Sequence, residues 1–146
     1  MKKILSVVCI VFLCLAVFIF IWWSLDDDRP GTARNVQINI GSSERFTQEE
    51  IESAVDLVVS DFGFINSELT DLWYDEVISD LEIERAHLDL DKDSTIILFS
   101  TIVVSEPGGP GFLSPGTLEN FAWVLVREAQ SGEWELVALG FGGINF

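Results

Sequence analysis

The pattern of hydrophobic and polar positions divides the chain into an apolar run and a longer mixed region. From Ile4 to Trp23 there is no charged side chain, and 14 of these 20 residues are Leu, Ile, Val or Phe. As a helix rising about 1.5 Å per residue, the run is roughly 30 Å long, which matches the hydrocarbon core of a bilayer. Trp22 and Trp23 suit the membrane interface. Two lysines precede the run and three aspartates follow it, so it predicts a single-pass anchor with a cytoplasmic N-terminus and an extracytoplasmic remainder.

Two other roles for this run remain open, a cleaved signal peptide and a lipoprotein leader. A signal peptide has an apolar core of about 7–15 residues and a small-residue cleavage site, whereas this longer run ends in Trp22–Leu25 without one. A lipid-bearing cysteine would end the apolar core, but Cys9 and Cys14 lie in its middle. We therefore expect an uncleaved anchor. The expected organisation is an anchor within residues 1–25, a tether over residues 26–35 and one extracytoplasmic domain over residues 36–146.

The extracytoplasmic part begins with a strand pattern, followed by a strong helix pattern. Alternating apolar residues over 36–40 predict a half-buried strand. Thr47 with Glu50 forms the pattern of a capping box, and Phe46 stands where a hydrophobic staple would. The helix is expected to end near Gly63. Apolar residues at 3.6-residue spacing predict its buried face, made of Ile51, Ala54, Val55, Val58, Val59 and Phe62.

The rest of the pattern predicts mostly strands. β-Branched and apolar residues over 95–104 give the clearest strand, and an aromatic-rich strand is expected over 69–75. Residues 76–90 suit a short irregular helix, while the glycine- and proline-rich residues 105–120 suit a long loop. Two final strands, over 121–127 and 134–141, are expected to form a hairpin. This order predicts an α+β domain in which a curved antiparallel sheet packs on one long helix.

The charge balance restricts the partners of this domain. All 24 carboxylates and six of the eight basic residues follow the apolar run. A domain this acidic repels phosphate backbones and anionic lipid, so nucleic acid is not expected as a partner. A cation, a basic peptide, a cationic envelope component or another protein partner suits this domain better, although the simpler interpretation, which we favour, is that the charge only keeps the domain soluble. Both cysteines lie inside the run, so the domain has no disulfide, thiol nucleophile or thiolate metal site.

Four short strings carry a resemblance to a known family, namely Ser43–Phe46, Leu72–Glu76, Trp123–Arg127 and Gly132–Leu136. With them the chain resembles, over roughly residues 36–141, a family of short membrane-attached single-domain proteins of Gram-positive bacteria, catalogued as a domain of unknown function. That family is similar in fold to cystatin-like and nuclear-transport-factor-like proteins. The resemblance implies this fold and an envelope location, and no activity. Many members are lipoproteins, which the lipidation context here does not match.

The residues around 71–76 concentrate carboxylates beside aromatic rings. Trp73, Tyr74, Asp75 and Glu76 are candidate ligand-binding residues, since aromatic rings stack on sugars and paired carboxylates can run acid–base or glycosidic chemistry. Successive strand residues face opposite sides of a sheet, so Asp75 and Glu76 make a poor catalytic pair. The simpler interpretation, which we favour, places Trp73 in the core with the acids in solvent. No catalytic residue is assigned.

Three other features carry weaker signals of chemistry. Asp89–Ser94 has the alternating carboxylates of a calcium loop but lacks its sixth-position glycine and twelfth-position glutamate, so a solvated turn is expected. The glycine-rich residues 108–111 include no basic residue and make a poor phosphate loop, although Phe112 and Leu113 beside them are candidates for the lip of a binding site. His87 is the only histidine, and the sequence has no Gly-x-Ser-x-Gly elbow, so we predict neither a zinc site nor a catalytic triad. No cofactor is expected.

These observations predict a non-enzymatic, single-pass membrane protein that displays an acidic binding domain at the cell envelope. A pocket between the long helix and the sheet is the expected ligand site. One alternative is a small envelope hydrolase or isomerase that uses Asp75, Glu76 or His87 there, which two convergent acids in a pocket would favour. Another is a structural or immunity-type protein that acts through surface contact, which an exposed apolar loop would favour.

Overall fold

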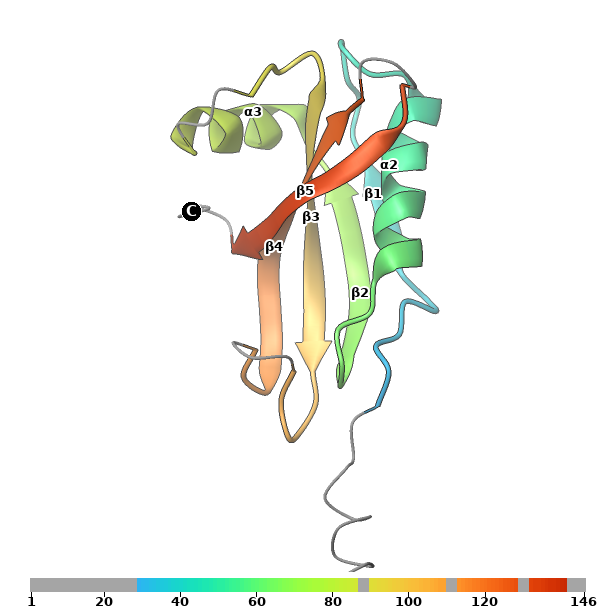
Figure 1. The fold of residues 1–146 in the computed structure, drawn as a ribbon, viewed down its shortest axis with the longest axis vertical. Coiled ribbons are helices and arrows are strands. Elements are labelled where there is room, and N and C mark those ends of the chain that lie inside the picture. Colours follow the sequence, from blue (N-terminus) through green and yellow to red (C-terminus); the bar gives the residue numbers. More distant parts are fainter. Residues whose placement is uncertain (1–28, 87–89, 110–112, 129–131, 142–146) are drawn as a thin grey trace, which may run out of the picture.

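The computed structural model describes residues 29–86, 90–109, 113–128 and 132–141, which form one twisted sheet with two helices (Figure 1). The elements in chain order are β1 (Gln37–Ile40), α2 (Gln48–Asp61), β2 (Ser67–Tyr74), α3 (Glu76–Arg85), β3 (Thr95–Val104), β4 (Gly116–Arg127) and β5 (Trp134–Phe141). The five strands lie side by side in this same order. The α+β prediction is therefore confirmed.

The sheet is mixed, which corrects the prediction of an antiparallel sheet. β1 runs parallel to β2, whereas the other three neighbouring pairs are antiparallel. The reason is the connection between β1 and β2. α2 carries the chain back along the sheet, so β2 starts at the same end as β1, as in other helix crossovers between parallel strands.

α2 covers one face of the sheet and supplies the main core. The Thr47 hydroxyl accepts the Glu50 N–H, and the Glu50 carboxylate accepts the Thr47 N–H at 2.8 Å, so the capping box is confirmed. Phe46 is buried beside the start of the helix. The helix ends at Asp61, close to the expected Gly63. Its predicted apolar face packs on the sheet through Ile51, Ala54, Val55 and Val58, with Val59 only half-buried.

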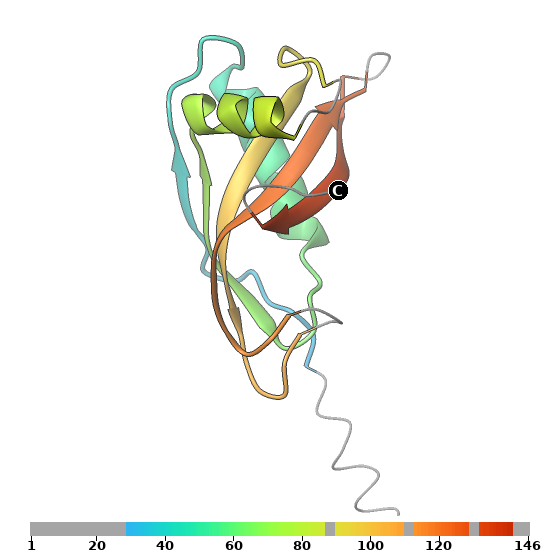
Figure 2. The same ribbon diagram turned by 90° about the vertical axis from the view of Figure 1, so that its left-hand side faces the viewer.

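α3 lies across the opposite face of the sheet, at the end where β2 stops and β3 begins (Figure 2). A second apolar cluster joins the two, and consists of Ile83, Ile97, Phe99, Ala122 and Val124. Ser79 is buried, and its hydroxyl accepts the Ile97 N–H at 3.1 Å. Val77, Ile78 and Leu81, in contrast, are exposed. Because α3 buries a polar residue and exposes apolar ones, the sequence over 76–90 has no amphipathic pattern.

The loop expected over residues 105–120 is shorter, because β4 already begins at Gly116. Leu118 lies opposite Ile102 of β3, so the two strands remain paired through this region. A shift of register interrupts their pairing, and Asn120 beside it adopts a φ of 56°. This polar, glycine-containing segment pairs with the end of β3, and the local pattern of the sequence does not indicate that pairing.

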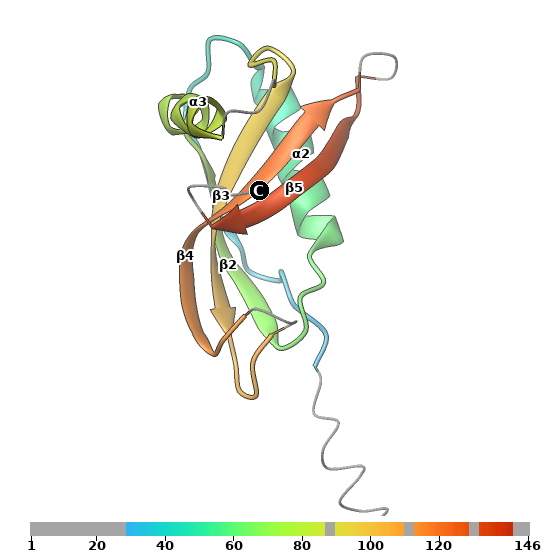
Figure 3. The ribbon, with the colours of Figure 1, turned by 60° about the vertical axis from the view of Figure 1, so that its left-hand side comes forward.

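The chain enters the domain at the end of the sheet opposite α3 (Figure 3). The Arg29 N–H donates to the Asn66 side chain at 2.8 Å. Gly31 passes so close to Phe64 that a Cβ atom would lie 2.9 Å from the Phe64 nitrogen, and only glycine avoids this contact. No helix within the described ranges is long and apolar enough to cross a membrane. The predicted anchor, with Ile4, Trp22 and Trp23, lies outside the described residues.

Candidate functional site

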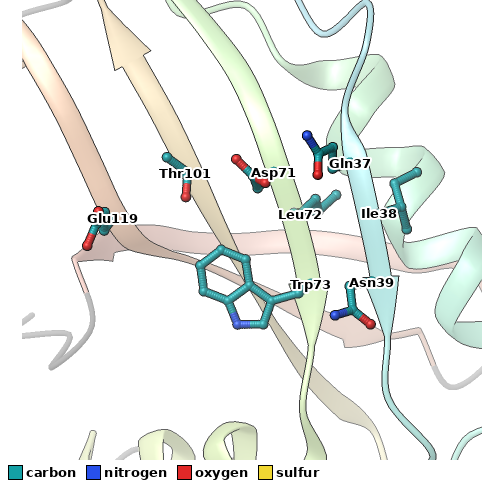
Figure 4. A pocket seen from close by; sticks show the side chains of 8 residues that line it. All are labelled: Gln37, Ile38, Asn39, Asp71, Leu72, Trp73, Thr101 and Glu119. Atoms are coloured by element: carbon teal, nitrogen blue, oxygen red, sulfur yellow. The ribbon is translucent and has the colours of Figure 1, made fainter.

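A groove of about 480 Å³ opens on the face of the sheet that points away from α2, which we call the outer face (Figure 4). α3 covers only one end of this face (Figure 2), and Trp73 of the groove packs against the cluster that contains Ile83 of α3. The groove is lined by Gln37, Ile38 and Asn39 of β1, Asp71, Leu72 and Trp73 of β2, Thr101 of β3 and Glu119 of β4. The space between α2 and the sheet, where a pocket was expected, is filled by buried apolar side chains.

Strand register brings the polar groove residues together. Gln37 of β1 lies opposite Asp71 of β2, and Asp71 lies opposite Thr101 of β3. Glu119 joins this row from β4, next to the shift of register between β3 and β4. Neighbouring strands are about 4.8 Å apart, so the four side chains form a polar row across the outer face (Figure 4).

Trp73 forms the aromatic part of the groove in the adjacent row. It lies opposite Asn39 on one side and Phe99 on the other. Its ring stacks on that of Phe99, with 6.1 Å between the ring centroids and 28° between their planes. Trp73 is thus held at the margin of the α3 cluster but stays half-buried. This corrects the prediction of a core residue, since the buried tryptophan of the main core is Trp123, which is 2% exposed.

The polar groups of the groove are available to a ligand. Asp71 accepts a hydrogen bond from the Thr70 hydroxyl at 2.7 Å, which leaves other lone pairs of its carboxylate free. In the part of the chain that the structure describes, the side chains of Gln37, Asn39 and Glu119 form no hydrogen bond or ion pair with the protein. None of the lining residues is basic. Two carboxylates therefore share the groove with an indole ring and two amides, and with no cation from the lining.

Asp75 and Glu76, the two acids predicted as candidate ligand-binding residues, lie outside the groove and form hydrogen bonds with other parts of the domain. The Asp75 carboxylate caps α3 by accepting the Ile78 N–H at 3.0 Å. Glu76 accepts a hydrogen bond from the Ser43 hydroxyl and another from the Glu44 N–H at 3.1 Å. These two carboxylates fix α3 and the loop before α2, and neither lines the groove.

Tyr74 and Arg45 extend this network. Tyr74 is buried in the main core, and its hydroxyl donates to Glu76 at 3.5 Å. Burial raises the pKa of Tyr74. Arg45 donates to Asp80 at 2.5 Å. Burial opposes the charge of Arg45, but its hydrogen bond to Asp80 keeps its pKa above the ordinary value. Tyr74 and Trp73 therefore point to opposite faces of β2, and only Trp73 belongs to the groove.

Of the other sequence candidates, the structure describes Leu113, which does not line the groove. Leu113 is 4% exposed and packs in the main core, while Phe112 and His87 lie outside the described residues. The acidic turn is described from residue 90 onward. There the Asp91 carboxylate accepts the Asp93 N–H at 3.1 Å, and the backbone forms a compact turn. Among the described residues no group of three or more His, Cys, Asp or Glu side chains could hold a metal ion.

Four residues of the groove were missed in the sequence, namely Gln37, Asn39, Thr101 and Glu119. A partial signal existed, since Gln37 and Asn39 alternate with apolar residues and so face away from the core. Nothing in the sequence indicates which outward residues of four strands meet. Comparison with known proteins found no matching family model, no matching curated protein and no matching solved structure.

Proposed function

We propose that this chain is a single-pass membrane protein that displays an acidic extracytoplasmic domain, and that the groove around Trp73 binds a cationic group of the cell envelope. The supporting observation is that Trp73, Asp71 and Glu119 line one groove that has no basic residue. An ammonium or guanidinium group is attracted to the face of an indole within about 6 Å of its centroid, and to carboxylates. The net charge of −16 adds a long-range attraction for cations.

The size of the groove suits a small charged group with its surroundings. Its volume of about 480 Å³ falls within the ~300–1,000 Å³ range of small-molecule sites. Gln37 and Asn39 add amide donors and acceptors along one side (Figure 4), which suits a ligand that carries polar groups beside its charge. The stacking on Phe99 holds the Trp73 ring in place, so binding requires little ordering of this side chain.

The test is a titration of the full-length chain, in a neutral detergent, with cations that are not peptides. Spermidine and a glucosamine trimer are the probes, and the N-acetylated trimer is the uncharged match. We expect both cations to bind more tightly than the acetylated trimer. Trp73→Ala should weaken binding about 2- to 30-fold, because a cation–π contact contributes roughly 0.5–2 kcal/mol.

Two substitutions of equal charge provide the control. Asp71→Asn removes a carboxylate inside the groove, and Asp56→Asn removes one on the exposed side of α2. Binding should fall for Asp71→Asn and change little for Asp56→Asn. Equal losses of cation affinity in the two variants would show that binding depends on net charge alone. Binding that is insensitive to Trp73→Ala, or equal for the charged and acetylated trimers, would overturn the proposal.

One observation favours the alternative of an envelope hydrolase, since Asp71 and Glu119 line the same groove from β2 and β4. A general acid at neutral pH needs a desolvated carboxyl with a raised pKa. Glu119 is exposed and Asp71 is only half-buried in an open groove, which favours binding over catalysis. Release of new reducing ends from cell-wall glycan, abolished by Glu119→Gln, would establish the hydrolase instead.

The membrane attachment is tested separately. If the apolar run from Ile4 to Trp23 is an uncleaved anchor, the chain should stay in the membrane pellet after extraction with alkaline carbonate. Its intact mass should then include this run. A mature chain that starts between Ser24 and Asp28 would show a cleaved leader, and a lipid adduct on Cys9 or Cys14 would show lipidation.

A further inference from the structure

The groove reaches a free edge of the sheet, and we propose that its cation belongs to an extended polypeptide that adds to β1 as a further strand. The partner would be a segment in which a basic side chain enters the groove while its backbone pairs with β1. This inference rests on the proposed function, because it requires the groove to accept a cation. It adds the chemical class of the ligand, a peptide, and the way in which it is held.

The backbone of β1 has unused hydrogen-bonding groups along this edge. β1 pairs with β2 on one side, and the Gly41 N–H continues that ladder by donating to the Tyr74 carbonyl at 3.0 Å. The backbone N–H and C=O groups of successive strand residues point to alternate edges of the strand. Those of Asn39, two residues before Gly41, therefore also point toward β2. The N–H and C=O groups of Ile38 and Ile40 therefore point away from the sheet, where a further strand can pair with them.

Apart from its short length of four residues, β1 lacks the usual protection of an edge strand. Natural edges carry charged side chains, proline or bulges that prevent pairing with another chain. The four residues of β1, Gln37–Ile40, include no charge and no proline, and their pairing with β2 has no shift of register. Ile38 is 51% exposed. β1 is the last strand of the sheet at this margin of the molecule (Figure 2).

The position of the groove next to this edge determines which side chain enters it. An added strand would lie about 4.8 Å beyond β1 and thus about 9.6 Å from β2. A lysine side chain extends roughly 6 Å from its Cα atom. From the outer face of the added strand it can pass between Gln37 and Asn39 toward Asp71 and Trp73 (Figure 4). The charges are complementary, since the lining has two carboxylates and no cation.

The opposite face of the added strand meets a different surface. Side chains alternate across a strand, so the neighbours of the lysine point to the α2 side of the sheet. The exposed apolar residue there is Ile38. The preferred segment is therefore one in which basic and apolar residues alternate.

The experiment uses blocked synthetic peptides and the full-length chain in neutral detergent. One peptide contains Val-Lys-Val-Lys, and its isomer contains Val-Val-Lys-Lys, so the two have the same composition and charge. The alternating peptide is also made in two N-methylated forms, one at both Lys amides and one at both Val amides. Only one of these two sets can face β1 in an added strand.

We expect the alternating peptide to bind at least tenfold more tightly than its isomer. We expect one N-methylated form to bind at least tenfold more weakly than the unmethylated alternating peptide. The affinity of the other form should stay within about threefold of that of the unmethylated peptide.

The outcomes separate this inference from the proposed function. If both N-methylated forms bind alike and the isomer binds as well as the alternating peptide, strand addition is wrong. Binding of spermidine that depends on Trp73 would still support the proposed cation groove. If no cation binds in a manner that depends on Trp73, both proposals are wrong together.

A pair of protein variants gives an independent check at the edge. Ile40→Pro removes an N–H that points away from β2, so the β1–β2 ladder can remain, and Ile40 does not line the groove. Ile40→Thr keeps this N–H and a β-branched side chain. We expect Ile40→Pro to lose at least tenfold in affinity for the alternating peptide, and both variants to bind spermidine as the unchanged chain does. Retained spermidine binding shows that the groove is intact. Equal peptide binding by the two variants would contradict the inference.

Discussion

At the scale of single residues, Phe46 links the start of α2 to the C-terminal hairpin. The guanidinium carbons of Arg45 and Arg127 lie 5.6 Å and 5.5 Å from the centroid of its ring. Arg127 also lies over the ring of Trp134 at 4.9 Å and pairs with Glu50 at 2.9 Å. The N-cap of α2 and the end of β4 are therefore connected through a few charged and aromatic side chains, and Glu50 is shared between the cap and the ion pair.

The ionisation of Glu50 should make part of the stability depend on pH. Its hydrogen bond from the Thr47 backbone, and then the charge of Arg127, lower the pKa of Glu50 below its ordinary value of 4.5. Since the folded-state pKa is the lower one, the stabilisation is fully present above pH 4.5 and is lost as the pH falls through the folded-state pKa. Glu50→Gln should therefore cost less than about 1 kcal/mol at pH 7, because a partly exposed ion pair is screened.

Melting temperatures between pH 7 and pH 3 provide the measurement for Glu50. The difference between the unchanged chain and Glu50→Gln should shrink at the acid end. Glu49→Gln, one residue earlier and exposed, is the control and should show a smaller difference at pH 7. A Glu50→Gln difference that is constant with pH would show that the charge plays no part.

The two tryptophans on opposite faces of the sheet should differ in their contribution to stability. Trp123 is 2% exposed and donates from Nε1 to the Ser100 hydroxyl at 2.8 Å, so Trp123→Ala should cost about 3–5 kcal/mol. Trp73 is half-buried, so Trp73→Ala should cost roughly 1–2 kcal/mol. Urea unfolding of the full-length chain in neutral detergent measures both. A larger cost for Trp73 than for Trp123 would place Trp73 in the core after all.

At the scale of elements, α3 is attached to the sheet by one buried hydroxyl and one buried apolar residue, without a continuous apolar face. Asp75 caps its first turn, and Ser79 accepts a hydrogen bond from the backbone of β3. Ile83 is the buried apolar residue of the helix. Trp73 of the groove packs against the apolar cluster that includes Ile83, so the attachment of α3 bears on the position of this groove residue.

Removing the buried hydroxyl of Ser79 should weaken the attachment of α3. Ser79→Ala leaves the Ile97 N–H buried without its acceptor, which should cost about 1–3 kcal/mol in the free energy of unfolding. Val77→Ala, at a site 69% exposed on the same helix, is the matched control and should change stability by less than ~0.5 kcal/mol. Equal effects in chemical denaturation would mean that Ser79 is not needed to hold α3.

At the scale of the whole molecule, the two ends of the sheet differ in their role. The described chain enters beside the start of β2, where Arg29 bonds Asn66, and α3 lies at the other end. In the proposed anchored protein, the entry end faces the membrane. The groove then opens sideways from the middle of the domain, and β1 forms its margin.

The acidity of the domain should produce a general response to divalent cations, without a tight calcium site in the acidic turn. The turn lacks the sixth-position glycine and the bidentate glutamate of a calcium loop. Millimolar calcium should raise the melting temperature slightly through screening, and magnesium at matched ionic strength should do nearly as well. A specific site would show a much larger effect, since a ligand at about 100 times its dissociation constant adds ~2.7 kcal/mol. A strong preference for calcium that Asp91→Asn abolishes would contradict this prediction.

The sequence by itself determined the features that depend on near neighbours in the chain. Thr47 and Glu50 are three residues apart, so the capping box was readable, as were the apolar face of α2 and the β3 strand over 95–104. The tertiary structure decided what depends on pairing between distant residues. These features are the parallel direction of β1, the strand that begins at Gly116, and the position of α3. Trp73, Asn39 and Glu119 meet in one groove only because four strands pair in a particular register. Alternation within a strand indicates which residues face outward, but register is set by contacts that the local pattern does not contain.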